Sequence, residues 1–218
     1  MFKLVRPGAP VPSFQVDFYP FTGVRHIIHL NDNGVQVRLS DILKGAPPLV
    51  FEALAEILIC RVYGHASSRE AQDYYRVFMS SPRIERRAER MRRERGTKKM
   101  VSPRGEAHDL QTMFRHLNRR YFSGRLRGVK IGWSLRRSRS VLGHFDPAHR
   151  VIIINRKLDH AQVPPFALEF LIYHEMLHLK FPPLRRSGRR VFHSCEFREA
   201  ETKFPCFTEA RKKLRFLC

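Results

Sequence analysis

The residues with the clearest chemistry lie in the run Tyr173-His174-Glu175-Met176-Leu177-His178. On a helix, residues four positions apart lie on one face about 5–6 Å apart, so the imidazoles of His174 and His178 can reach one ion. Zinc accepts neutral imidazole nitrogen at about 2.0–2.1 Å in tetrahedral sites. Glu175 follows His174 by about 100° around the helix, so it lies beside the ion and can act on water there. The spacing therefore predicts a zinc site with an adjacent base.

The local context supports this prediction. A helix is predicted from about Pro164-Pro165 to Lys180, where Pro182-Pro183 ends it. Its other residues are largely apolar, and they include Phe166, Leu168, Phe170, Leu171, Leu177 and Leu179. Two histidines on adjacent turns of such a helix are awkward to bury unless they share a ligand.

A catalytic zinc site needs a third protein ligand and one open position. The chain leaves the helix at Pro182-Pro183 and turns near Gly188, so a downstream residue can return to the ion. The candidates for that third ligand are His193, Cys195, Glu196, Glu199 and Glu201. A histidine gives a three-imidazole site and a helical glutamate gives a thermolysin-like site, and the residue types alone leave both open.

The charge of the chain predicts a polyanionic partner. Among 218 residues, 41 Lys and Arg oppose 20 Asp and Glu, a formal net charge of +21. Nucleic acid is the commonest partner of such a field, although solubility or a generally Arg-rich source also explains it. Residues 82–105 hold ten Lys and Arg against three Glu, and they fit either a phosphate-contacting arm or a solvated linker helix. The candidate nucleic-acid contacts are Arg83, Arg86, Arg87 and Arg90, with Arg136-Arg137 and the later patch Arg185, Arg186, Arg189 and Arg190.

Composition excludes several classes of protein. Hydrophobic residues make up 43% of the chain, which is ordinary for a globular protein and excludes wholesale disorder. No uncharged apolar run is long enough to span a membrane, and no secretory signal is visible at the N-terminus. The four cysteines are scattered, as in a protein with reduced thiols. We therefore expect a cytoplasmic protein with no membrane partner.

Residues 1–100 are expected to form a mainly α-helical region with one β-hairpin. The hairpin joins residues 24–30 to 35–39 through Asn31-Asp32-Asn33-Gly34, and Ser40 caps a short turn after it. Helices are predicted from Pro47 to about Tyr63, from Ser67 to Met79 and from Pro82 onward. Residues 1–13 are expected to form a loose arm, and residues 96–105 a linker.

Residues 101–218 are expected to form an α+β domain with a small three-stranded sheet. A helix is predicted over residues 110–121, because Leu110, Phe114, Leu117 and Tyr121 form one stripe. Strands are predicted over 129–133, 141–145 and 150–155, the last two joined as a hairpin by Asp146-Pro147-Ala148-His149. Two closing helices are predicted over 196–204 and 208–216.

The same half of the chain resembles the SprT-like zinc metalloproteases, the Spartan-related family. The matching features run in order from about Ala107 to Cys218: residues 114–126, a strand ending in Trp133-Ser134, residues 142–147 leading to 151–155, the His-Glu-x-x-His motif, and His193-x-x-x-Phe197. Ser194 stands where the family often has glycine. No cysteine pairs for an additional zinc ribbon are present, and residues 1–100 match none of these features.

The resemblance implies a zincin-like metalloprotease domain. It implies His174, His178 and His193 as zinc ligands and Glu175 as the general base. Tyr173 and His144 are candidates for an oxyanion donor.

Three functions follow as hypotheses. The first is a zinc-dependent protease acting on DNA-associated or DNA-crosslinked proteins, with single-stranded or crosslinked DNA as a partner. The second is a nucleic-acid-binding protein whose zinc is structural and which has no protease activity. The third is a peptidase with no DNA dependence.

Overall fold

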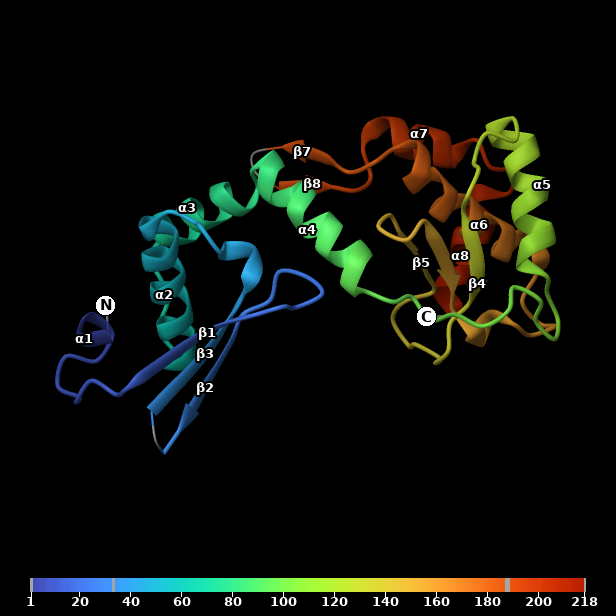
Figure 1. The fold of residues 1–218 in the computed structure, drawn as a ribbon. Helices are drawn as coiled ribbons and strands as arrows, with labels where there is room; N and C mark the ends of the chain where they lie inside the picture. The colour runs from blue at the N-terminus through green and yellow to red at the C-terminus, as the bar shows by residue number, and fades with distance from the viewer. Residues whose placement is uncertain (1, 33, 187–188, 218) are drawn as a thin grey trace. The chain divides into compact units, whose positions relative to one another are not determined.

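A computed structural model describes residues 2–32, 34–186 and 189–217 (Figure 1), with only the backbone described for Leu4, Arg185, Arg186, Arg189 and Arg190. The chain divides into two compact units, Met1–Gly96 and Thr97–Cys218. Each unit combines helices with its own three-stranded sheet, so the fold class is α+β, as predicted. Among the described residues, no helix is both long and apolar enough to cross a bilayer.

The first unit contains the predicted hairpin and one strand that the sequence analysis missed. Strands β2 and β3 pair antiparallel around residues 31–34, as expected. The prediction of a loose arm over residues 1–13 is wrong in part, because helix α1 forms near its start and Phe2 is buried. The missed strand is β1, which begins directly after these residues and pairs parallel to β3. The elements are α1 (Phe2–Val5), β1 (Phe14–Tyr19), β2 (Ile27–Asn31), β3 (Gly34–Ser40), η1 (Asp41–Leu43), α2 (Pro48–Val62), α3 (Arg69–Met79) and α4 (Pro82–Arg95).

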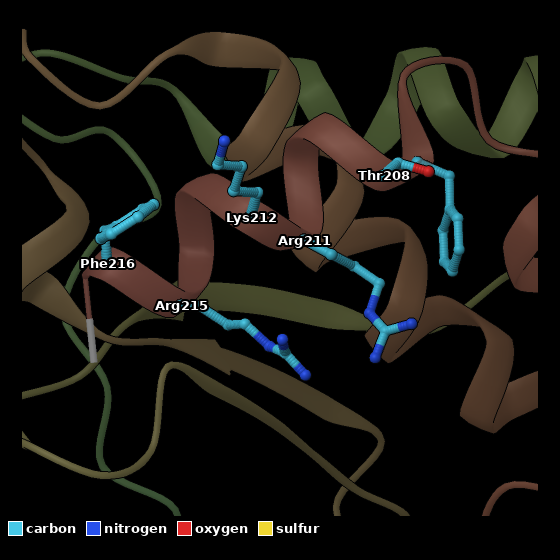
Figure 2. Close-up of a pocket in the computed structure, with 6 residues that line it drawn as sticks. Thr208, Arg211, Lys212, Arg215 and Phe216 are labelled. Atoms are coloured by element: carbon cyan, nitrogen blue, oxygen red, sulfur yellow. The ribbon is translucent and has the colours of Figure 1, made fainter.

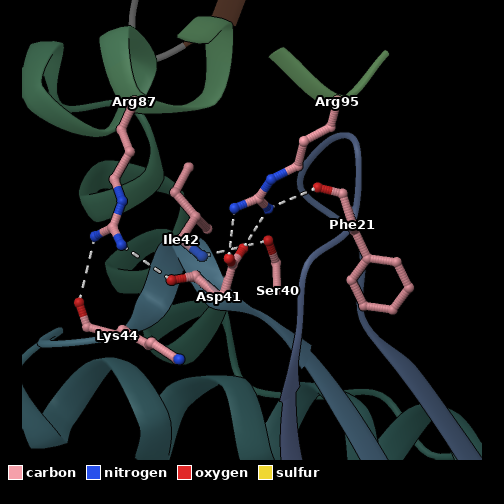
Figure 3. A network of polar contacts seen from close by, with 7 residues as sticks. All are labelled: Phe21, Ser40, Asp41, Ile42, Lys44, Arg87 and Arg95. Carbon is pink, nitrogen blue, oxygen red and sulfur yellow. Dashed lines mark hydrogen bonds and ion pairs between the residues drawn. The ribbon is translucent and has the colours of Figure 1, made fainter. Parts of the chain in front are cut away.

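Helix α4 is the predicted basic helix, and it is packed into the core of the first unit. Ile84, Ala88 and Met91 form its buried seam, against residues of β3 and α2. Figure 3 shows that polar contacts add to this packing: Arg95 donates to both carboxylate oxygens of Asp41, at 2.8 and 2.7 Å. Arg87 donates to the carbonyl oxygens of Asp41 and Lys44. The helix is therefore anchored at two points along its length.

The second unit is built around helix α6. Its sheet has the order β4-β6-β5, with β4 parallel and β5 antiparallel to β6, so the predicted hairpin is confirmed. The all-apolar strand β6 is buried throughout, as its composition indicated. Helix α6 contacts α5, α7, α8 and strands β5 and β6. The elements are α5 (Leu110–Phe122), β4 (Lys130–Trp133), β5 (Gly143–Asp146), β6 (Val151–Ile154), η2 (Arg156–Leu158), α6 (Pro165–Lys180), β7 (Leu184–Arg186), β8 (Arg189–Val191), α7 (Cys195–Thr202) and α8 (Phe207–Phe216).

Two segments of the second unit differ from expectation. Residues 97–105 are not a free linker, because Val101 N–H donates to the Trp133 carbonyl at 2.9 Å. Just beyond them, the Asp159 carboxylate accepts hydrogen bonds from the backbone N–H groups of residues 106–108. Strands β7 and β8 were missed, and they pair as an antiparallel ribbon between α6 and α7. The connecting residues 187–188 lie outside the described part of the chain.

Candidate metal centre

Helix α6 presents His174 and His178 on one face because they are four residues apart, and its buried residues hold that face in place. Pro165 stands at its first turn, which suits proline because the missing N–H has no partner there anyway. Nine of its sixteen residues are buried, including Leu168, Ile172 and Met176 at 0% exposure. His174 and His178 are half-buried and one turn apart, so they lie on the same face of the helix.

The structure brings His193 to the two histidines of α6. The ring centroids of His174 and His178, His174 and His193, and His178 and His193 are each 5.1 Å apart. One nitrogen from each ring lies within 4.8 Å of the other two. The ribbon of β7 and β8 returns the chain to this place, so His193 precedes α7 directly. The three imidazoles form an equilateral arrangement from two distant segments.

This triangle fits one zinc ion. Its centre lies about 2.9 Å from each ring centroid, from the equal 5.1 Å sides. A zinc–nitrogen bond of about 2.0–2.1 Å, with the nitrogen about 1.2 Å from the ring centre, requires about 3.2 Å. The spacing of the rings is therefore compatible with one zinc ion that His174, His178 and His193 would hold together.

Both His178 and His193 are in the neutral form that a metal requires. Burial, and then His174 and His193, lower the pKa of His178 to about 4. Burial and His174 also lower the pKa of His193. Because metal binding needs a deprotonated imidazole nitrogen, neither ring has to lose a proton at neutral pH.

Phe197 packs against all three imidazole rings. It is fully buried, and its ring centroid lies 5.2, 4.7 and 4.8 Å from those of His174, His178 and His193. Ser194 fixes the start of α7, because its Oγ accepts a hydrogen bond from the Phe197 N–H at 3.2 Å. A serine here is a favourable N-cap, which gives this departure from the family pattern a structural role.

Glu201 supports His174 from α7. Its Oε1 lies 2.6 Å from His174 Nδ1, and its side chain is 15% exposed. A carboxylate can only accept, so Nδ1 carries the proton and Nε2 is left to face the ion. The sequence analysis considered Glu201 as a possible third ligand. Because Glu201 contacts Nδ1 of His174, it is placed to orient that imidazole and not to bind the metal itself.

The other possible third ligands do not join this group. Cys195, Glu196 and Glu199 are exposed, and Glu199 forms an ion pair with Lys203. Among the described residues, the set of metal-ligating side chains that converges here consists of His174, His178 and His193. The role of these three histidines as zinc ligands remains a prediction, and the spacing of their nitrogen atoms is compatible with it.

Glu175 lies between α6 and the edge strand β5. It is 5% exposed, and the Phe145 backbone N–H donates to its carboxylate. Gly143 leaves room for this arrangement, because a Cβ there would meet Glu175 Oε1 at 3.3 Å. Burial raises the pKa of Glu175 to about 7, against the opposing effects of His174 and the Phe145 N–H. A carboxyl group of this kind can take up and release a proton near neutral pH.

These groups line a cleft of about 850 Å³. His174, Glu175 and His193 lie on its wall, with Leu142 and Gly143 at the β5 side. The volume suits a peptide segment or a small molecule. The imidazoles of His174 and His193 and the carboxylate of Glu175 therefore border space that a substrate can enter.

Other residues named from the sequence occupy different places. Tyr173 is buried, and its hydroxyl donates to the Ala200 carbonyl at 2.8 Å, so it belongs to the core. His144 is half-buried in β5. The four arginines of α4 that the sequence predicts as nucleic-acid contacts are exposed, and they are Arg83, Arg86, Arg87 and Arg90. The side chains of Arg185, Arg186, Arg189 and Arg190 lie outside the described residues.

The fold and site define an α+β domain with a candidate three-histidine metal centre in an open cleft. The model of the SprT-like family matches residues 110–212, which span this domain from the start of α5 into α8. This match supports an assignment of the domain to the SprT-like family and confirms the resemblance. Searches of curated proteins and of solved structures gave no match.

The contact between Glu201 and His174 gives a direct prediction. Glu201→Ala should weaken zinc binding about 10–100-fold, because the outer partner of a metal-bound histidine fixes its tautomer and orientation. Competition against a chromogenic chelator measures this affinity. Glu199→Ala is the matched control on the same helix, because Glu199 is exposed and pairs only with Lys203 among the described residues. Equal zinc affinity in the two variants would show that Glu201 does not support the site.

Proposed function

We propose that this protein is a zinc-dependent peptidase that uses Glu175 as its general base. The observation that supports this most strongly is the equal 5.1 Å spacing of three imidazoles beside a buried carboxylate in an open cleft. The match to the SprT-like family model agrees with a metallopeptidase.

The residues of the chain supply the metal-binding and acid–base groups that peptide hydrolysis needs. Zinc, when bound, lowers the pKa of water toward 7 and polarises a carbonyl oxygen. His174, His178 and His193 would hold the ion, and Glu201 would keep His174 in the required tautomer. Glu175 takes a proton from the attacking water as its oxygen bonds to the carbonyl carbon. The same carboxyl group gives the proton to the leaving nitrogen as the carbon–nitrogen bond breaks.

A structural zinc site is the competing function, and the position of Glu175 argues against it. A structural site is closed by four protein ligands, whereas three converging histidines leave one position open. A purely structural ion also needs no buried carboxylate beside it. Holding Glu175 at 5% exposure costs stability, and an acid–base role accounts for that cost.

Glu175→Gln separates these two functions. The amide has the same shape but cannot take a proton, so cleavage of casein or histone should fall about 100–10,000-fold while one zinc per chain is retained. Metal content is measured on the same samples, and chelation of the parent should abolish its cleavage. Undiminished cleavage by the variant would contradict the proposed role of Glu175.

We further propose that the substrates are proteins associated with or crosslinked to DNA. The net charge of +21 supports this, together with the exposed arginines of α4. Arg83, Arg86 and Arg90 are the best candidates there, because Arg87 already donates to two backbone carbonyls. Phosphate contacts by such residues make binding depend on salt.

Replacing Arg83, Arg86 and Arg90 with glutamine should weaken binding of single-stranded DNA. If each contacts one phosphate, the slope of log affinity against log salt should flatten by about 2. Fluorescence anisotropy at several salt concentrations measures both quantities. The matched control replaces three exposed arginines on α5, Arg115, Arg119 and Arg120. Equal losses in both triple variants would mean that the overall field, and not α4, binds the DNA.

A further inference from the structure

The candidate catalytic cleft has a basic wall that the proposed mechanism does not use. Arg198 on α7 and Arg211 and Arg215 on α8 line the same cavity as His174 and Glu175. All three arginines are exposed, so their guanidinium groups are accessible from the cleft. A second hollow of about 480 Å³ adjoins it and shares Arg211 and Arg215 in its lining.

Helix α8 directs these arginines by its spacing. Phe207, Arg211 and Arg215 are four residues apart, so they form one row along the helix. Ala210 and Leu214 are buried on the inner face and fix the rotation of α8. Figure 2 shows Arg211 and Arg215 extending from one side of α8, whereas Lys212 extends from the other. The Arg211 guanidinium lies 5.3 Å from the centroid of the Phe207 ring, which restricts its movement.

The neighbouring carboxylates of α7 offset the positive charge of this wall only in part, because Arg211 interacts electrostatically with Glu201 while Arg198 and Arg215 add two further charges. Glu201 is engaged by His174, and Glu199 by Lys203. The remaining acidic residue of the cleft wall, among the described residues, is the buried Glu175. A ligand in the cleft therefore meets guanidinium groups that still have donors available for an anion.

We propose that Arg211 and Arg215, with Arg198, form a subsite that binds an acidic side chain of the peptide substrate. The proposal rests on the proposed peptidase function and names a substrate class for it. Guanidinium groups bind carboxylates through charge-assisted and often bidentate hydrogen bonds. Because the subsite and Glu175 share one cavity, a peptide lying beside Glu175 can place an Asp or Glu side chain against the arginines.

A phosphate of nucleic acid is the other anion that fits guanidinium groups, and the geometry favours the carboxylate. The arginines line the cavity that holds Glu175, so a nucleic-acid strand bound there would occupy the space that the peptide needs. An acidic side chain is part of the peptide itself, so its binding does not exclude the peptide from the cleft. The exposed arginines of α4 belong to the first unit and are a separate feature.

The test measures peptide binding without cleavage. Zinc-loaded Glu175→Gln protein is titrated into two labelled peptides that differ only by an Asp-Asp or Asn-Asn pair at the centre. Fluorescence anisotropy should give at least about tenfold tighter binding of the acidic peptide, as expected for a charge-assisted contact. Adding Arg211→Gln and Arg215→Gln should remove this preference and leave binding of the neutral peptide unchanged.

A matched control separates the subsite from the overall charge. Lys203→Gln with Lys213→Gln also removes two positive charges from exposed positions near α7 and α8, and neither residue lines the cleft. This double variant should keep the preference for the acidic peptide. If both double variants reduce the preference equally, long-range charge accounts for it and the subsite is disproved.

Two further outcomes would overturn the proposal. The first is equal binding of the two peptides to the zinc-loaded Glu175→Gln protein. The second is a loss of oligonucleotide affinity in Arg211→Gln/Arg215→Gln with no change in peptide preference, which would assign the arginines to phosphate. The peptide-binding titration tests the subsite, and the cleavage comparison between the parent and Glu175→Gln tests the peptidase function. Because the two measurements are separate, either proposal can be disproved without the other.

Discussion

The candidate site depends on the burial of helix α6. Apolar side chains cover almost every face of this helix, and they pack against α5, α7, α8 and the sheet. Because such an interior is close-packed, α6 can neither rotate nor slide without opening cavities. The directions of His174, His178 and Glu175 are therefore set by the hydrophobic core. The polar groups of the site contribute alignment within that frame, through Glu201 and the Phe145 N–H.

The site is assembled from one rigid element and one returning segment. Helix α6 supplies two imidazoles and the carboxylate, and the chain after β8 supplies His193. Phe197 joins these parts, because its buried ring contacts all three imidazoles. Helix α7 thus carries Phe197, which packs against the three imidazoles, and Glu201, which contacts His174. Arg198 on α7 and Arg211 and Arg215 on α8 give the same cleft positive charge.

The sequence predicted those parts of this arrangement that depend on local spacing. The i, i+4 histidines, the apolar helix and the two hairpins are encoded within short segments, and the structure contains them. Strand β1 was missed because its partner β3 is distant and parallel, although Phe14, Val16 and Phe18 alternate with polar residues. The supporting contact of Glu201 and the shared wall of Arg211 and Arg215 depend on how α7 and α8 pack, which spacing alone does not specify. Residue type did limit the third ligand to five candidates, and tertiary structure brought His193 to the pair.

The central claim is that three imidazoles hold one zinc ion and leave a position open. X-ray absorption at the zinc edge of the metal-loaded protein tests it most directly, because it counts nitrogen, oxygen and sulfur neighbours at the ion. Three imidazole ligands and one further light atom at about 2.0–2.1 Å are expected. A sulfur neighbour near 2.3 Å would indicate Cys195, and only two imidazoles would exclude His193. Either result would contradict the three-histidine centre on which the peptidase proposal depends.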